Sequence, residues 1–181
     1  MKAIIHNANM SERSFAIELA IILSAACMMA ALSRITIPLQ PVPVTGQTLG
    51  VLLTGMMLGR KRALAAMLTY IAMGVIGLPV FANGAFGAAT LIGPPGGYLL
   101  GFIPAAFIMA YLGEKGWYKH TATAVSALLI GHTVIFAFGL LWLGILMNGS
   151  NVLAIGFIPF IPGALAKTLI AFALIPVVKQ I

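Results

Sequence analysis

Lys167 is the residue of this sequence whose chemistry most needs an explanation. It lies in an apolar segment, four positions after Gly163 and about 6 Å below the expected start of a helix. A lysine inside a membrane span is costly unless it is paired, neutral or able to reach the interface. The three glutamates, Glu12, Glu18 and Glu114, fall toward the opposite end of the spans. We therefore expect the ammonium to bind a carboxylate of a small solute, with snorkelling to the outer headgroups as the alternative.

Four other polar side chains stand where apolar segments meet their connections. They are Gln47, Thr48, Asn83 and Tyr98. Amide and hydroxyl groups of this kind can hydrogen-bond an amide or urea group of a solute. Each of them could instead cap a helix or close a turn. Together with Lys167 they indicate a binding site for a small polar molecule.

Catalytic and metal-binding motifs are missing from the sequence. It contains no aspartate, no glycine-rich phosphate loop and no His-Glu-x-x-His pair. Its single cysteine, Cys27, excludes an intrachain disulfide and a cysteine-based metal cluster. We expect no metal, no cofactor and no enzymatic activity. A multi-pass membrane enzyme acting on a lipid is the alternative from another class, which the scarcity of acids disfavours.

The composition indicates a membrane protein. Of the 181 residues, 61% are hydrophobic and only 7% are charged, and the mean hydropathy is +1.10. The net charge of +7 comes from cations that lie mostly between apolar runs, which predicts topology signals and not a nucleic-acid partner. We expect a cytoplasmic segment over residues 1–14, followed by one transmembrane domain over 15–181 that is surrounded by membrane lipid.

Six apolar segments predict an all-α membrane protein of six transmembrane helices. The expected helices are Phe15–Leu32, Thr45–Leu58, Ala63–Gly77, Gly97–Leu112, Thr121–Met147 and Gly163–Val178. With both termini in the cytoplasm, eight cations fall on the inner side, and the outer connections keep only Arg34. The inner cations are Lys2, Arg13, Arg60, Lys61, Arg62, Lys115, Lys119 and Lys179. This distribution satisfies the positive-inside rule, which an odd number of helices would break.

Prolines mark the outer connections as rigid. Eight of the ten prolines map there, and proline fixes φ and lacks a backbone donor. A proline with a glycine one to three positions later marks the start of the second, fourth and sixth helices, at Pro43, Pro95 and Pro162. Three helix starts on one side would point their free N–H groups at an anionic solute, although such residues are also ordinary in turns. The long uncharged connection Leu78–Gly96 is expected to cover the site as a lid.

Small residues recur along the first helix. Ala16 and Ala20, and then Ala26 and Ala30, are each four positions apart, which permits the close approach of another helix. These four alanines are candidates for docking a partner protein. Packing within the monomer explains the same pattern.

Four motifs in order resemble the BioY family. They are Pro41-Val42-Pro43-Val44-Thr45-Gly46-Gln47-Thr48, Gly77-Leu78-Pro79-Val80-Phe81-Ala82, Gly93-Pro94-Pro95-Gly96-Gly97-Tyr98-Leu99-Leu100-Gly101-Phe102, and Pro159-Phe160-Ile161-Pro162-Gly163 with Lys167. The resemblance covers most of the chain from the first helix onward. One departure is Ala164, where the family usually has an aspartate three residues before the lysine.

The resemblance implies the substrate-binding S subunit of an energy-coupling factor (ECF) transporter in a prokaryotic-type inner or plasma membrane. Such a subunit binds biotin from outside, and ATP is used only by partner subunits. It implies biotin contacts by Gln47, Asn83, Tyr98 and Lys167, with the amide and phenol groups at the ureido ring and Lys167 at the valerate carboxylate or the ring. The implied partners are a transmembrane coupling protein, which the alanine stripes of the first helix would face, and two ATPases. A solitary relative would work as a homo-oligomer or as a self-sufficient carrier, and a carrier of another small carboxylate is the alternative.

Overall fold

The structure is a computed structural model that describes residues 2–178, with side chains described for residues 14–176. Lys179, and the side chains of Lys2 and Arg13, all used in the orientation prediction, lie outside this part. The proposed division at residue 14 does not coincide with a helix boundary, because the first helix is continuous from Lys2 to Leu32.

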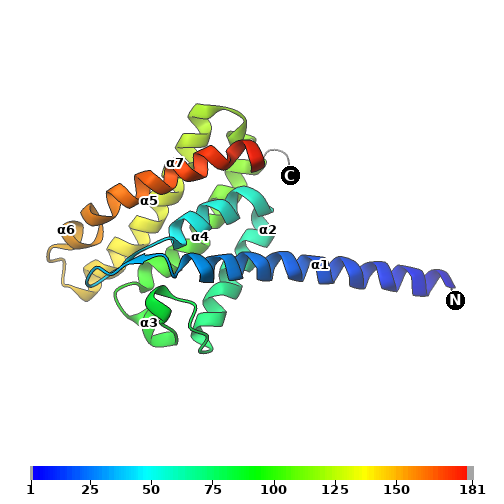
Figure 1. Cartoon of the computed structure of the whole chain (residues 1–181), viewed down its shortest axis with the longest axis horizontal. Helices are drawn as coiled ribbons and strands as arrows, with labels where there is room; N and C mark the ends of the chain where they lie inside the picture. Colours follow the sequence, from blue (N-terminus) through cyan, green and yellow to red (C-terminus); the bar gives the residue numbers. More distant parts are fainter. Residues whose placement is uncertain (1, 179–181) are drawn as a thin grey trace.

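Long apolar helices make up most of the chain, and short elements connect them (Figure 1). The elements in order are α1 (Lys2–Leu32), β1 (Thr36–Ile37), β2 (Val44–Thr45), α2 (Gln47–Val75), η1 (Ala82–Gly84), α3 (Ala88–Ile92), α4 (Gly96–Glu114), η2 (Trp117–Lys119), α5 (Thr121–Leu146), α6 (Val152–Gly156), η3 (Ile158–Phe160) and α7 (Ile161–Val178). The small antiparallel pair of β1 and β2, with Thr36 opposite Thr45, was not predicted.

The element α2 is two helices that turn back on each other at Gly59. Gly59 has φ 70° and ψ 163°, which is not helical and favours glycine. The Gln47 and Tyr70 side chains share a hydrogen bond although they are 23 positions apart. A straight helix would separate them by about 35 Å, so the two halves must run antiparallel. They correspond to the second and third predicted helices.

With α2 counted as two, six long helices form the bundle within residues 2–178, and the predicted fold class is confirmed. Within the described residues, four helical stretches are long and apolar enough to cross a membrane by themselves: Ser14–Leu32, Gly96–Glu114, Thr121–Leu146 and Val152–Pro176. Each half of α2 is shorter than the roughly 20 residues that a full span needs. This protein is therefore a membrane protein in which α2 depends on its neighbours.

The helix α4 lies at the centre of the bundle, between α2 and α5 (Figure 1). Glycines allow the close approach of α4 to α5. A Cβ atom at Gly97 would collide with Trp142 and the carbonyl of Phe138, and one at Gly139 would collide with the ring of Tyr98. Close packing of α5 against α4 thus fixes the position of Tyr98 near the start of α4.

Charged side chains gather at one end of the bundle, around the turn at Gly59. Arg60 pairs with Glu114 at 2.5 Å, and Arg62 pairs with Glu18 of α1. Both glutamates with described side chains are therefore engaged far from Lys167. The opposite end, where α2 and α4 begin, carries the two proline-rich connections, so the bundle has one charged end and one covered end.

Candidate binding site

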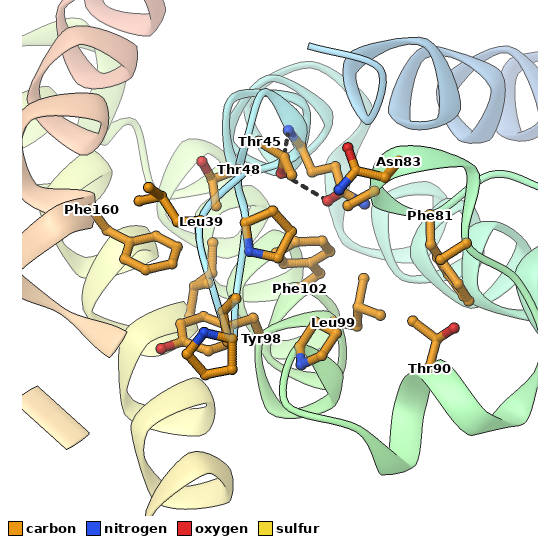
Figure 2. A pocket seen from close by; sticks show the side chains of 18 of the residues that line it. Leu39, Thr45, Thr48, Phe81, Asn83, Thr90, Tyr98, Leu99, Phe102 and Phe160 are labelled. Carbon is orange, nitrogen blue, oxygen red and sulfur yellow. Dashed lines mark hydrogen bonds between the residues drawn. The ribbon is translucent and has the colours of Figure 1, made fainter. Parts of the chain in front are cut away.

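A cavity of about 280 Å³ lies at the covered end of the bundle. Its floor is made by the first turns of α2 and α4 together with α5 and α7. The connections α1–α2 and α2–α4 cover it. In Figure 2, Tyr98 and Phe160 lie on one side of the cavity, and Phe81 and Asn83 lie on the opposite side. The volume is close to the lower limit of typical small-molecule sites, so the ligand must be compact.

All four predicted site residues line this one cavity. Gln47 comes from the start of α2, Tyr98 from the start of α4, Lys167 from the second turn of α7 and Asn83 from the covering loop. Three helix starts thus converge on one cavity. The long connection after α2 covers it, as the proline and glycine pattern predicted.

Lys167 is half-buried and holds the start of α7 against the start of α2. Its Nζ donates to the backbone oxygen of Thr45 at 2.6 Å and to Thr48 Oγ1 at 2.8 Å. An ammonium has three donors, so a third hydrogen is left for another acceptor. Among residues 14–176, no carboxylate lies within ion-pair distance of this ammonium. Its positive charge is therefore held at the cavity by neutral oxygens alone.

A chain of hydrogen bonds fixes the carboxamide of Gln47. Thr45 Oγ1 donates to Gln47 Oε1 at 2.8 Å, Gln47 Nε2 donates to the hydroxyl of Tyr70, and that hydroxyl donates to the carbonyl of Val80 at 2.9 Å. Gln47 is only 3% exposed. One amide hydrogen and one lone pair of the carboxamide remain for a ligand, at a fixed orientation.

The hydroxyl of Tyr98 is turned away from the role predicted for it. It donates to the carbonyl of Gly156 at 2.7 Å and so ties α4 to α6. The ring stacks on Phe160 with centroids 5.6 Å apart and stands edge-on to Phe136. Tyr98 therefore presents an aromatic surface to the cavity, and its hydroxyl proton is already bonded.

We expect Tyr98→Phe to change ligand affinity by less than about threefold. The substitution keeps the ring and removes one neutral hydrogen bond, which should lower stability by about 1 kcal/mol. The measurement is equilibrium binding together with a thermal melt. A loss of affinity beyond about tenfold, with an unchanged melting temperature, would show that the hydroxyl contacts the ligand.

The covering loops are tied to each other and to the bundle. Arg34 donates through Nη2 to the carbonyl of Pro79, and Ser33 Oγ lies 3.4 Å from the carbonyl of Phe81. Trp142 of α5 donates to the carbonyl of Gly93 at 3.0 Å. Asn83 has φ 55° and ψ 21°, a left-handed conformation that asparagine tolerates well. Asn83 therefore lies at the cavity in a tight turn, and hydrogen bonds fix the covering loop before this turn, at Pro79 and Phe81, and after it, at Gly93.

Sequence reasoning missed Tyr70, Phe136 and the role of Thr45. Tyr70 has no exposed surface, and a buried tyrosine hydroxyl almost always has a partner. A tyrosine in the middle of an apolar segment was thus a usable signal. Thr45 had no such signal, because its bond to Gln47 depends on the local turn.

The four alanines of α1 that were predicted to dock a partner differ in burial. Ala26 has no exposed surface, and Ala30 packs against the same internal cluster, so this pair serves packing within the chain. Ala16 and Ala20 are exposed. Docking through these two remains a prediction.

Ala164, the position at which the sequence departs from the BioY pattern, does not line the cavity described above. It lies in a second cavity, between α5 and α7. Within the described residues, no three His, Cys, Asp or Glu side chains lie close enough together to hold a metal ion.

Comparison with known proteins identifies the family. The sequence model of the BioY family matches residues 6–181. The chain is 40% identical over 142 residues to a protein of Thermotoga maritima named biotin transporter BioY, covering 76% of this chain and 80% of that one. It is 30% identical to a probable biotin transporter BioY of Rickettsia prowazekii, covering 95% and 88%.

The fold also matches that of a solved protein. A crystal structure of the S-component for biotin from an ECF-type ABC transporter superposes with a TM-score of 0.82, covering 93% of this chain and 94% of that one at 23% identity. Convergent helix starts, the proline-rich cover and a match over nearly the whole sequence lead to one assignment: this chain belongs to the BioY family.

Proposed function

We propose that this chain captures biotin from the outer side of a prokaryotic-type inner or plasma membrane, as the substrate-binding subunit of an ECF-type vitamin transporter. The observation that carries the proposal is the Lys167 ammonium, which lies at a compact cavity with no carboxylate partner among residues 14–176. Relatives named biotin transporters support the choice of ligand.

The valerate carboxylate of biotin is the proposed partner of Lys167. An ammonium that is partly removed from water gains most from a ligand of opposite charge. The third hydrogen of Nζ supplies the donor, and Thr48, whose hydroxyl already accepts from Nζ, can donate its own proton to the same carboxylate. In this arrangement the ligand carboxylate completes an incomplete ion pair.

The ureido ring of biotin is the proposed partner of Gln47 and Asn83. A urea offers one acceptor and two donors, and a carboxamide offers both kinds of group in return. The bonds from Thr45 and to Tyr70 hold the Gln47 amide in one orientation, which lowers the entropy lost on binding. The apolar thioether ring would then pack on Tyr98 and Phe160, which form the aromatic side of the cavity.

The same proposal assigns the covered end of the bundle to the outside and both termini to the cytoplasm. The charged end around Gly59 then carries Arg60, Lys61 and Arg62 on the inner face, as the positive-inside rule requires. The chain is not proposed to be an enzyme. Energy for concentrating biotin would come from a coupling protein and two ATPases, or the chain would act alone as a homo-oligomer.

A ligand series tests the proposal. We expect the purified chain to bind biotin about 100-fold more tightly than biotin amide, because a charged hydrogen bond contributes about 1.5–3 kcal/mol. The same acid without its ureido ring should bind at least about tenfold more weakly than biotin. Equal affinity for all three molecules would overturn the proposed site. Strong binding of unrelated small acids would instead favour a general carboxylate carrier.

Transport by the chain alone is a separate question. Purified protein in sealed vesicles, assayed for uptake of labelled biotin, distinguishes a solitary carrier from a subunit that needs partners. Binding without uptake would support the ECF-type assembly, whereas uptake down the biotin gradient would support the solitary form.

A further inference from the structure

The molecule contains a second cavity next to the first. It is an open groove of about 380 Å³ between α5 and α7, lined almost entirely by apolar groups, some of which, such as Leu129 and Leu165, are exposed. Thr168 lines it, although the preceding residue, Lys167, lines the first cavity. Lys167, the proposed partner of the ligand carboxylate, is therefore the sequence neighbour of a residue that lines the second cavity.

Aromatic side chains stand between the two cavities. Among the described residues, Phe136 alone lines both of them. Its ring is held edge-on by Phe157 at a centroid distance of 5.1 Å and by Phe160 at 6.1 Å. Tyr98 makes a third edge contact at 6.5 Å, and Phe136 is 9% exposed. Phe136 is thus a fixed wall between the cavities.

One residue that lines the second cavity has a buried polar atom without a hydrogen-bond partner among the described residues. His132 is 5% exposed and stacks near Phe136, and its Nε2 is buried and makes no hydrogen bond within the described residues. Its Nδ1 lies 3.2 Å from the carbonyl of Leu128, which favours a proton on Nδ1 and leaves Nε2 as an acceptor.

We propose that Phe136 determines ligand length: it confines the ligand to the first cavity and excludes derivatives extended at the carboxyl end. The inference rests on the proposed function, because it places that end beside Lys167. Removing the ring would join the cavities, and an extended ligand could then bury its added methylene groups against the apolar residues of α5 and α7.

Two neutral probes test this without involving the charge of the carboxylate. They are biotin amide and biotin N-butylamide, which differ only by the butyl group. We expect the wild-type chain to bind the amide at least about tenfold more tightly than the butylamide, because the Phe136 ring occupies the space that four added carbons would need. We expect Phe136→Ala to bind the butylamide more tightly than the amide, by about tenfold or more. Phe136→Leu should shift the ratio of the two affinities in the same direction.

Phe102→Ala is the matched control. Phe102 is also buried, and it lines the first cavity but not the second, so its removal adds space without joining the two. We expect it to leave the ratio of the two affinities within about threefold of the wild-type ratio. Thermal melts identify variants that fail to fold, and Phe136→Leu decides the question if Phe136→Ala is among them.

The outcomes separate this inference from the function on which it rests. If the wild-type chain does not bind biotin, the proposed function fails. If it binds biotin, and its affinity for the butylamide equals its affinity for the amide, the role of Phe136 as a wall is contradicted without any mutant. An unchanged ratio in a folded Phe136 variant would contradict it as well.

Discussion

Lys167→Met lowers the affinity for biotin by about 100-fold, while the affinity for biotin amide changes by less than about threefold. Methionine keeps much of the apolar stem and removes the charge, so the expected loss is that of one charged hydrogen-bonded pair, about 2–3 kcal/mol. The amide cannot form that pair and should be insensitive. The measurement is equilibrium binding of both ligands to both proteins.

The comparison of acid with amide is what makes this prediction specific. Lys167 also joins α7 to α2 through the Thr45 carbonyl and Thr48, so its loss could weaken binding by loosening the cavity. Loosening would reduce the affinity for acid and amide equally, and that result would remove the carboxylate from this position. Lys61→Met, an exposed cation at the charged end of the bundle, is the matched control and should have no effect.

Gly139→Ala should lower both stability and affinity. The added Cβ would lie 2.3 Å from two ring atoms of Tyr98, whose ring is also stacked on Phe160. Overpacking of this kind costs about 1–3 kcal/mol, so we expect a fall of roughly 5 °C in melting temperature. Displacement of Tyr98 into the cavity should weaken biotin binding at least about tenfold, the loss that a misfit of about 1.4 kcal/mol produces.

Gly144→Ala is the control on the same helix. The nearest atom to a Cβ there is Val152 Cγ2 at 3.9 Å, an ordinary contact. Because alanine is the better helix former, this variant should be as stable as the wild type or more so. Equal behaviour of the two variants would show that α4 and α5 are not packed as closely as described.

The sequence was sufficient to predict the positions of the helices and the covered end. The prolines Pro43, Pro95 and Pro162 and the glycines near them locate the three helix starts, because proline fixes φ and lacks a backbone donor whereas glycine adopts turn conformations that other residues avoid. Lys167 was recognised because a cation in an apolar segment needs a partner. Such signals are local, and each can be interpreted from its own stretch of sequence.

What the sequence could not give depends on contacts between distant segments. The bond between Gln47 and Tyr70 exists because α2 folds back at Gly59, and the Tyr98 hydroxyl is turned outward because α6 places the Gly156 carbonyl beside it. Ala16 and Ala26 each have a second alanine four positions later, yet only Ala26 is buried, in the helix α1 that packs against α2. No periodicity along a single segment contains this information.

The effect of biotin on the labelling rate of an introduced cysteine tests the central claim, that the ligand lies in a cavity under an outer cover. Leu39 lies in that cover and lines the cavity, and Ile37 is an exposed residue of the same loop that does not. In a Cys27→Ser background, each would be changed to cysteine and labelled with an impermeant maleimide added outside intact cells. We expect both to be labelled, and biotin to slow labelling at position 39 by about tenfold but not at position 37. Labelling of position 39 only from the cytosolic side, or at a rate that biotin does not change, would contradict the account.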